Sequence, residues 1–420
     1  MWREEKLSIN GILKTIGPGI LYAGAAIGVS HLVFATQAGA SYSFHLLWAL
    51  VLINLFKYPF FEFAYRYTAA TGGSLLEGYK KLGNWAITTF FILSFSTAIV
   101  NFAAVTKVTT ALAIYLFHLK IDSFLSSLGL LGLILLMLFF GRYALLDKVM
   151  KLILFVLALF TVIAFAVAIF RYNPVSPEIT VPDIWNYAGI TFLIAFMGWM
   201  PTPIDASVWT SIWAIERKKQ TNYTPTFREY KFDFHLGYIG SAVMAFFFMG
   251  LGALVMYGTG QQFSDNGVTF SQQLVSLYSS TMGGWITYVI AVIAFLTMLS
   301  TAITVIDGYP RSLGGSLVQM FPLNQKWEGK MYYFWTIFLS FCAAVILGMF
   351  TENMRTLLEF ATIVSFIMAP VFAIFNFKVV TSKFFPADYK PPKWLKILSW
   401  AGIIFLIGFS FIYLYLIVFM

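Results

Sequence analysis

Apolar runs alternate with short polar segments along almost the whole chain. Each run is about 20 residues long, the length that a helix needs to cross the roughly 30 Å hydrocarbon core of a bilayer. Charged residues, glycines and prolines bound the runs, as they bound membrane helices. The pattern therefore predicts about eleven transmembrane helices, at residues 16–40, 46–65, 85–117, 124–140, 149–169, 187–215, 236–257, 285–306, 331–349, 357–377 and 394–419.

The composition supports an all-α membrane protein. Of the 420 residues, 60% are hydrophobic and 11% are charged, whereas soluble domains carry roughly 25% charged residues. No soluble core can enclose that much apolar surface. Because the predicted helices fill nearly the whole length, we expect a single transmembrane domain over residues 1–420 in a lipid bilayer.

Basic residues are distributed unevenly between the predicted loops. With a cytoplasmic N-terminus, 22 of the 27 lysines and arginines lie in cytoplasmic segments and three lie in outer loops, in agreement with the positive-inside rule. We therefore expect an inner-membrane protein whose C-terminus lies outside and whose polar first segment is not a cleaved signal peptide. No basic stripe with interleaved aromatics indicates a nucleic-acid partner.

Two of the predicted spans contain interruptions. The first has glycine and small residues at positions 28–30, and the sixth has Gly198, Pro201 and Pro203 in its middle. Proline removes a backbone donor and breaks a helix. Because the breaks are five spans apart, the two halves of the chain that contain them run in opposite directions through the membrane. This is the layout of inverted-repeat transporters, which bind substrate between two broken helices near the midplane. The alternative is that both are ordinary kinks.

Several short motifs resemble those of one transporter family. They are GPG at 17–19, QAGA at 37–40, Arg66 with TGGSL from Thr71, and Met200-Pro201 in the sixth span. Together with eleven spans, these motifs are similar to those of the natural resistance-associated macrophage protein (NRAMP) transporters. The resemblance covers most of the chain, with its specific motifs in the first, second and sixth spans.

The resemblance implies a leucine-transporter-like fold with residues 1–171 and 185–378 as inverted repeats and 394–420 as an appended helix. It also implies secondary-active, proton-coupled uptake of divalent metal cations such as manganese or iron. The chain departs from the family motifs at the implied site. The family's Asp-Pro-Gly-Asn is Gly28-Val29-Ser30-His31 here, its Met-Pro-His-Asn is Met200-Pro201-Thr202-Pro203, and two third-span acids are Ala103 and Thr106.

Polar residues at the breaks are the candidate substrate-binding groups: Gly28, Ser30, His31, Met200, Thr202 and Asp205. His31, Met200 and Asp205 are the candidate metal ligands, because a borderline divalent ion normally needs at least one hard or anionic ligand. The alternative interpretation of His31 is a neutral histidine that donates a hydrogen bond to a carbonyl freed by the break. The alternative interpretation of Asp205 is the N-cap of the helix that begins after the break.

Two lysines within the spans are candidates for coupling or gating, because ionisable groups in membrane helices are costly. Lys57 lies near the middle of the second span and is a possible counter-ion of Asp205. Lys107 lies in the outer half of the third span, where it either serves transport or snorkels to the surface. Asn101 and Thr301 belong to a group of polar residues that either line a path or bond back to their own helices.

Three other classes of function compete with metal transport. An enzyme is disfavoured because the chain has no HExxH, GxSxG or glycine-rich nucleotide loop, and we expect no cofactor. A receptor built on a transporter fold would bind without accumulating its ligand. A transporter of a small organic solute is favoured by the missing metal ligands. Loss of the first-span carboxylate at Gly28 predicts poor transport of manganese and iron.

Overall fold

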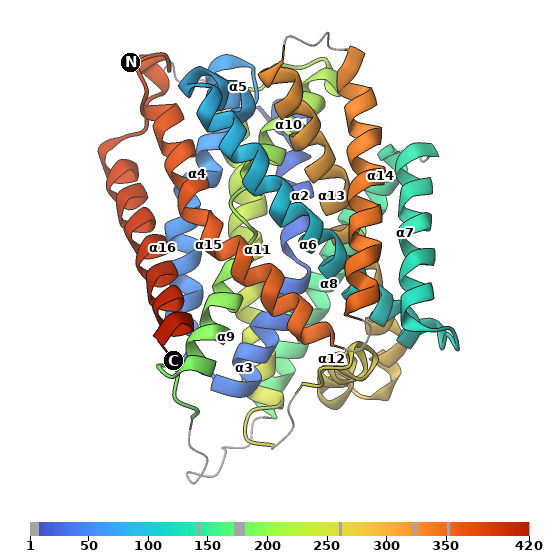
Figure 1. The fold of residues 1–420 in the computed structure, drawn as a ribbon. Coiled ribbons are helices and arrows are strands. Elements are labelled where there is room, and N and C mark those ends of the chain that lie inside the picture. The colour runs from blue at the N-terminus through green and yellow to red at the C-terminus, as the bar shows by residue number, and fades with distance from the viewer. Residues whose placement is uncertain are drawn as a thin grey trace.

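The computed structural model describes residues 8–140, 143–171, 181–259, 263–321, 326–350 and 353–419. These residues form a bundle of helices with no strand among them, and Figure 1 shows how the long helices run side by side. The predicted all-α class is confirmed.

The helices of the first half are α1 (Ile9–Thr15), α2 (Pro18–Ala26), the π-helix η1 (Ser30–Ala35), α3 (Thr36–Tyr42), α4 (Leu47–Thr71), α5 (Leu75–Leu82), α6 (Asn84–Phe117), α7 (Ser123–Phe140) and α8 (Tyr143–Phe170). Those of the second half are α9 (Tyr187–Gly198), α10 (Ala206–Thr221), α11 (Phe227–Val255), α12 (Gly267–Met282), the 3₁₀ turn η2 (Gly284–Ile286), α13 (Thr287–Met320), α14 (Lys326–Met349), α15 (Met354–Thr381), the 3₁₀ turn η3 (Ala387–Tyr389) and α16 (Lys393–Phe419).

Most of the predicted spans correspond to single helices. Within the described residues, nine helices are long and apolar enough to cross a membrane, and the pair α2 with residues 30–42, bent by 47°, makes a tenth. The predicted sixth span is divided between α9 and α10. At 12 residues, α9 reaches only about 18 Å at the helical rise and cannot cross alone. The C-terminal end of α16 and helix α5 lie at opposite ends of the bundle (Figure 1).

Two helices differ most from their predicted bounds. α11 begins at Phe227 rather than residue 236 because a capping box starts it there. In this box Thr226 Oγ1 accepts from the Glu229 amide at 3.2 Å, and the Glu229 carboxylate accepts from the Thr226 amide at 2.9 Å. α13 continues to Met320 rather than residue 306. Hydropathy locates the apolar part of a helix but not its polar extension.

Glycines allow the second half of the first span to pack closely on α11. A Cβ on Gly39 of α3 would lie 1.8 Å from Met249 O, and one on Gly252 of α11 would lie 2.0 Å from Thr36 O. Small residues of this kind let membrane helices bring their backbones together. The part of the first span that follows its break is therefore held firmly against α11.

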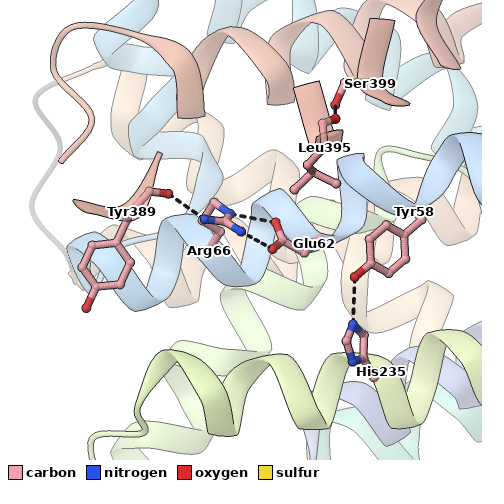
Figure 2. A network of polar contacts seen from close by, with 7 residues as sticks. All are labelled: Tyr58, Glu62, Arg66, His235, Tyr389, Leu395 and Ser399. Atoms are coloured by element: carbon pink, nitrogen blue, oxygen red, sulfur yellow. Dashed lines mark hydrogen bonds and ion pairs between the residues drawn. The ribbon is translucent and has the colours of Figure 1, made fainter. Parts of the chain in front are cut away.

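A network of polar contacts links α4 to two other parts of the bundle (Figure 2). The buried Glu62 and Arg66 form a bidentate ion pair with contacts of 2.5 and 2.9 Å, and Arg66 Nη1 donates to Tyr389 O at 2.8 Å. Tyr58 of α4 lies 2.8 Å from His235 Nε2 of α11. The network connects α4 with the α15–α16 connection on one side and α11 on the other.

We expect Arg66→Met to destabilise the protein by about 3–5 kcal/mol, because it leaves the Glu62 carboxylate buried without a partner. Thermal unfolding of the purified protein measures the loss. The double variant Glu62→Gln, Arg66→Met removes both charges and should recover most of the stability. A single variant that is as stable as the double variant would contradict this account of the pair.

Candidate functional site

The first span is broken as predicted. α2 ends at Ala26, and the chain resumes helical geometry as the π-helix η1 at Ser30. Thr301 of α13 donates from Oγ1 to Gly24 O at 2.8 Å, which satisfies one carbonyl next to the break. A Cβ on Gly28 would lie 2.5 Å from Thr301 Oγ1. Thr301 therefore occupies the space that a side chain at position 28 would need.

The sixth span is also broken where the prolines predict it. α9 ends at Gly198 and α10 begins at Ala206, so residues 199–205 are not helical. A Cβ on Gly198 would lie 2.1 Å from Thr362 O of α15, so the end of α9 is pressed against a neighbouring backbone. The two breaks also lie close to each other, because Ser30 Oγ is 3.4 Å from Pro201 O.

A small cavity with a volume of about 30 Å³ lies between the two breaks. Its walls come from both broken spans, from α6 and from α13, and every lining side chain is neutral. The lining residues are Ala25, Ala26, Val29, Ser30, Asn101, Val105, Trp199, Pro201, Thr202, Pro203, Trp209, Thr301 and Val305. Three polar atoms of this lining are buried without a hydrogen-bond partner: Asn101 Oδ1, Thr202 Oγ1 and Trp209 Nε1.

His31 is fully buried beside the cavity, and protein atoms contact both of its ring nitrogens. Nε2 lies 2.8 Å from Ser241 O of α11, and because a carbonyl only accepts, this nitrogen carries the hydrogen of the neutral ring. Nδ1 lies 2.7 Å from Ser30 Oγ. The ring thereby ties the first break to Ser241, which lies in the interior of α11 rather than at a break.

Asp205 precedes α10 but makes no side-chain capping hydrogen bond to it. Its Oδ2 accepts from Thr97 Oγ1 of α6 at 3.1 Å. The Tyr309 hydroxyl of α13 lies near the same carboxylate, yet Oδ1 has no partner at hydrogen-bond distance. A buried carboxylate oxygen is thus left unsatisfied close to the second break, two residues beyond the cavity-lining Pro203.

Lys57 of α4 is fully buried and contacts backbone rather than an acid. Its ammonium donates to Met197 O at 2.9 Å, to Gly198 O at 2.8 Å and to Thr202 O at 3.2 Å. The charge of Asp205 acts on it through space without a direct contact. The structure therefore places Lys57 at the second break, with partners other than the one expected from the sequence.

Lys107 and Met200 are both buried. Lys107 Nζ donates to Ser123 Oγ at 3.0 Å. Ser123 begins α7, so the Lys107 side chain extends toward the C-terminal end of α6. Met200 lies within the second break but is not among the residues that line the cavity. Within the described part of the chain, no group of three or more His, Cys, Asp or Glu side chains is arranged to hold a metal ion.

The sequence identified part of this arrangement. Ser30 and Thr202 line the cavity, and Gly28 packs against Thr301, which also lines it. His31, Met200, Asp205 and Lys57 are not among the lining residues. Trp199 and Trp209 were missed, although both flank the proline-rich break, and aromatic residues next to a break are a usable signal for a binding wall.

Comparisons with known proteins agree with the fold. The sequence pattern of the natural resistance-associated macrophage protein-like family matches residues 19–416. An uncharacterized protein of Pasteurella multocida is 35% identical over 414 residues, covering 98% of this chain and 94% of that protein.

Solved transporter structures share the same architecture. A mutant of the Eremococcus coleocola manganese transporter superposes with a TM-score of 0.70 at 15% identity, covering 96% of this chain and 86% of that one. MhsT in complex with L-phenylalanine superposes with a TM-score of 0.63 at 10% identity, covering 97% and 100% of the two chains. At these identities the likeness establishes the fold.

Proposed function

We propose that the substrate binds in the cavity between the two breaks. The premise is that this chain belongs to the natural resistance-associated macrophage protein-like family. It is accordingly a secondary-active membrane transporter rather than an enzyme. The observation that carries the proposal is the lining, to which both broken spans contribute. Transporters built from inverted repeats bind their substrates at this place. The repeats are 1–171 and 185–378, with 394–420 appended.

The first candidate substrate is a divalent metal cation held by a non-standard ligand set. The Eremococcus coleocola protein of the same fold is a manganese transporter. Unpartnered oxygens of Asp205, Asn101 and Thr202 lie at or near the cavity, and oxygen is the ligand that hard and borderline cations accept. Participation of His31 requires it to release Ser30 or Ser241, and participation of Met200 requires it to turn toward the cavity.

The second candidate is a small organic solute, and the chemistry of the lining favours it. Sites for small molecules have apolar and aromatic walls and a few polar groups that fix orientation. The cavity between Trp199 and Trp209 has these properties and no charged side chain in its lining. The MhsT structure shows that this fold also accepts an organic molecule, L-phenylalanine.

We expect purified protein to bind manganese more weakly than micromolar, because no carboxylate lines the cavity to offset dehydration of a dication. Isothermal titration with manganese measures the affinity, and Asp205→Ala is the matched variant. Micromolar binding that disappears in Asp205→Ala would refute weak binding and establish Asp205 as a substitute ligand. Absence of binding would direct uptake measurements in proteoliposomes to small organic solutes.

The same proposal includes the orientation and the coupling. The distribution of basic residues supports an inner-membrane location with the N-terminus in the cytoplasm and the C-terminus outside. Proton coupling is implied by the family, with Lys57 and Lys107 as the candidate coupling or gating residues. Uptake driven by an imposed proton gradient in proteoliposomes, compared with uptake in the presence of a protonophore, tests it.

A further inference from the structure

We propose that the ammonium of Lys57 is a built-in monovalent cation, which fills a site of backbone carbonyls at the sixth-span break that a free cation would otherwise occupy. The proposal goes beyond the substrate site, because it concerns a second ion position and assigns it a permanent occupant. It follows from three features of the structure: the origin of the carbonyls, the number of acceptors and the absence of a carboxylate contact.

The carbonyls come from backbone that the break has freed. The last turn of a helix has carbonyls without intrahelical partners and a partial negative charge, and α9 ends at Gly198. Met197 O and Gly198 O belong to that turn, and Thr202 O belongs to the non-helical segment that follows. Inside a bilayer these oxygens need a donor or a cation, because no bulk water reaches them.

The number of acceptors matches the number of donors. A lysine ammonium has three N–H donors and no acceptor, and three carbonyl oxygens lie 2.8 to 3.2 Å from Lys57 Nζ. The side chain is fully buried, so these contacts replace its hydration. A ring of neutral carbonyls in place of a hydration shell is also how proteins coordinate monovalent cations.

The contacts of Lys57 Nζ are also those of an ion in a site of carbonyls rather than those of a lysine in an ion pair. The acid whose charge acts on Lys57 is Asp205, and it does so without a direct contact; its Oδ2 accepts from Thr97 instead. Lys57 is supplied by α4, a different helix from the broken span, so its stem anchors the cation at a fixed place. The broken span is therefore stabilised by a cation that cannot dissociate, and it needs no sodium or potassium ion.

Lys57→Ala should empty the site and make it accessible to added cations. The measurement is the thermal unfolding temperature of the detergent-solubilised full chain in choline chloride and in equal concentrations of methylammonium, potassium or sodium chloride. We expect the wild type to unfold at the same temperature in all four salts. Lys57→Ala should unfold several degrees lower in choline, and methylammonium or an alkali cation should recover at least half of that loss in a saturable manner.

Two matched variants separate this account from a purely structural one. Lys57→Met has an apolar side chain of similar length that fills the site, so it should lose stability and not recover in any salt. Lys107→Ala removes a second buried lysine, one that bonds Ser123, and should show no difference between the salts. If Lys57→Ala cannot be isolated in choline, it should become isolable in methylammonium.

Four results would overturn the proposal. The first is a wild type that needs sodium or potassium for stability, and the second is a Lys57→Met variant as stable as the wild type. The third is a Lys57→Ala variant that responds alike to choline and to the small cations. The fourth is a Lys57→Ala variant that no small cation makes isolable. None of these results depends on which substrate the protein carries, so the proposal is tested separately from the proposed function.

Discussion

Replacing Gly28 with aspartate, which restores the carboxylate of the family motif, should unfold the protein rather than create a metal site. The new Cβ would lie 2.5 Å from Thr301 Oγ1 and 2.7 Å from Thr301 Cγ2, and Thr301 is a short branched side chain that has little freedom to move away. Overpacking of this kind costs about 1–3 kcal/mol, and a buried carboxylate without a partner adds several more. Yield of folded protein and thermal unfolding measure the effect.

Removing the obstruction should reverse the steric part of this result. In Gly28→Asp, Thr301→Ala the aspartate has room beside the cavity, at the cost of the bond from Thr301 to Gly24 O, about 1 kcal/mol. We expect the double variant to regain the overpacking cost of about 1–3 kcal/mol, to stay less stable than the wild type without metal because its new carboxylate is still unpaired, and to bind manganese more tightly than the wild type. Thr301→Ala alone is the control and should not gain manganese affinity. A single Gly28→Asp variant of wild-type stability would show that the space at Gly28 does not exclude a carboxylate.

The sequence allowed the architecture to be predicted because hydropathy and helix breakers act locally. An apolar run long enough to cross a bilayer is visible in the sequence, and so is the pair Pro201 and Pro203, which lacks two backbone donors. The polar extensions of α11 and α13 were missed because they lie outside the apolar runs. The capping box at Thr226 and Glu229 was a signal that could have located the start of α11.

The contacts of the site could not be predicted in the same way. Lys57 was a candidate counter-ion of Asp205, because pairing two charges within the membrane lowers the cost of both. The actual acceptors are main-chain carbonyls, which every residue carries and which become available only where a helix stops. The dihedral angles of the non-helical residues decide where those carbonyls and the neighbouring side chains point, and no periodic pattern encodes them.

The charge of Asp205 should matter more for transport than for folding. Its Oδ1 is buried without a hydrogen-bond partner, so loss of the charge removes an incompletely satisfied group and should not lower stability, while its position beside the second break lets it respond to an ion or a proton in the cavity. Asp205→Asn keeps the shape and the acceptor for Thr97 Oγ1. We expect a fall in uptake of at least about tenfold, equivalent to roughly 1.4 kcal/mol, with little change in unfolding temperature.

Asp307→Asn provides the matched control for that substitution, because it also removes a buried carboxylate charge but in a satisfied environment. Asp307 accepts from Arg311 at 2.7 Å and from Tyr332 at 2.9 Å, and it does not line the cavity. Loss of a charge-assisted bond of this kind costs about 1.5–3 kcal/mol, so Asp307→Asn should lower the unfolding temperature clearly. Uptake is measured in proteoliposomes with whichever metal ion or organic solute the wild type accumulates, normalised to the folded protein inserted. Normal uptake by Asp205→Asn at wild-type stability would exclude a transport role for the Asp205 charge and reduce that residue to a packing element of the break.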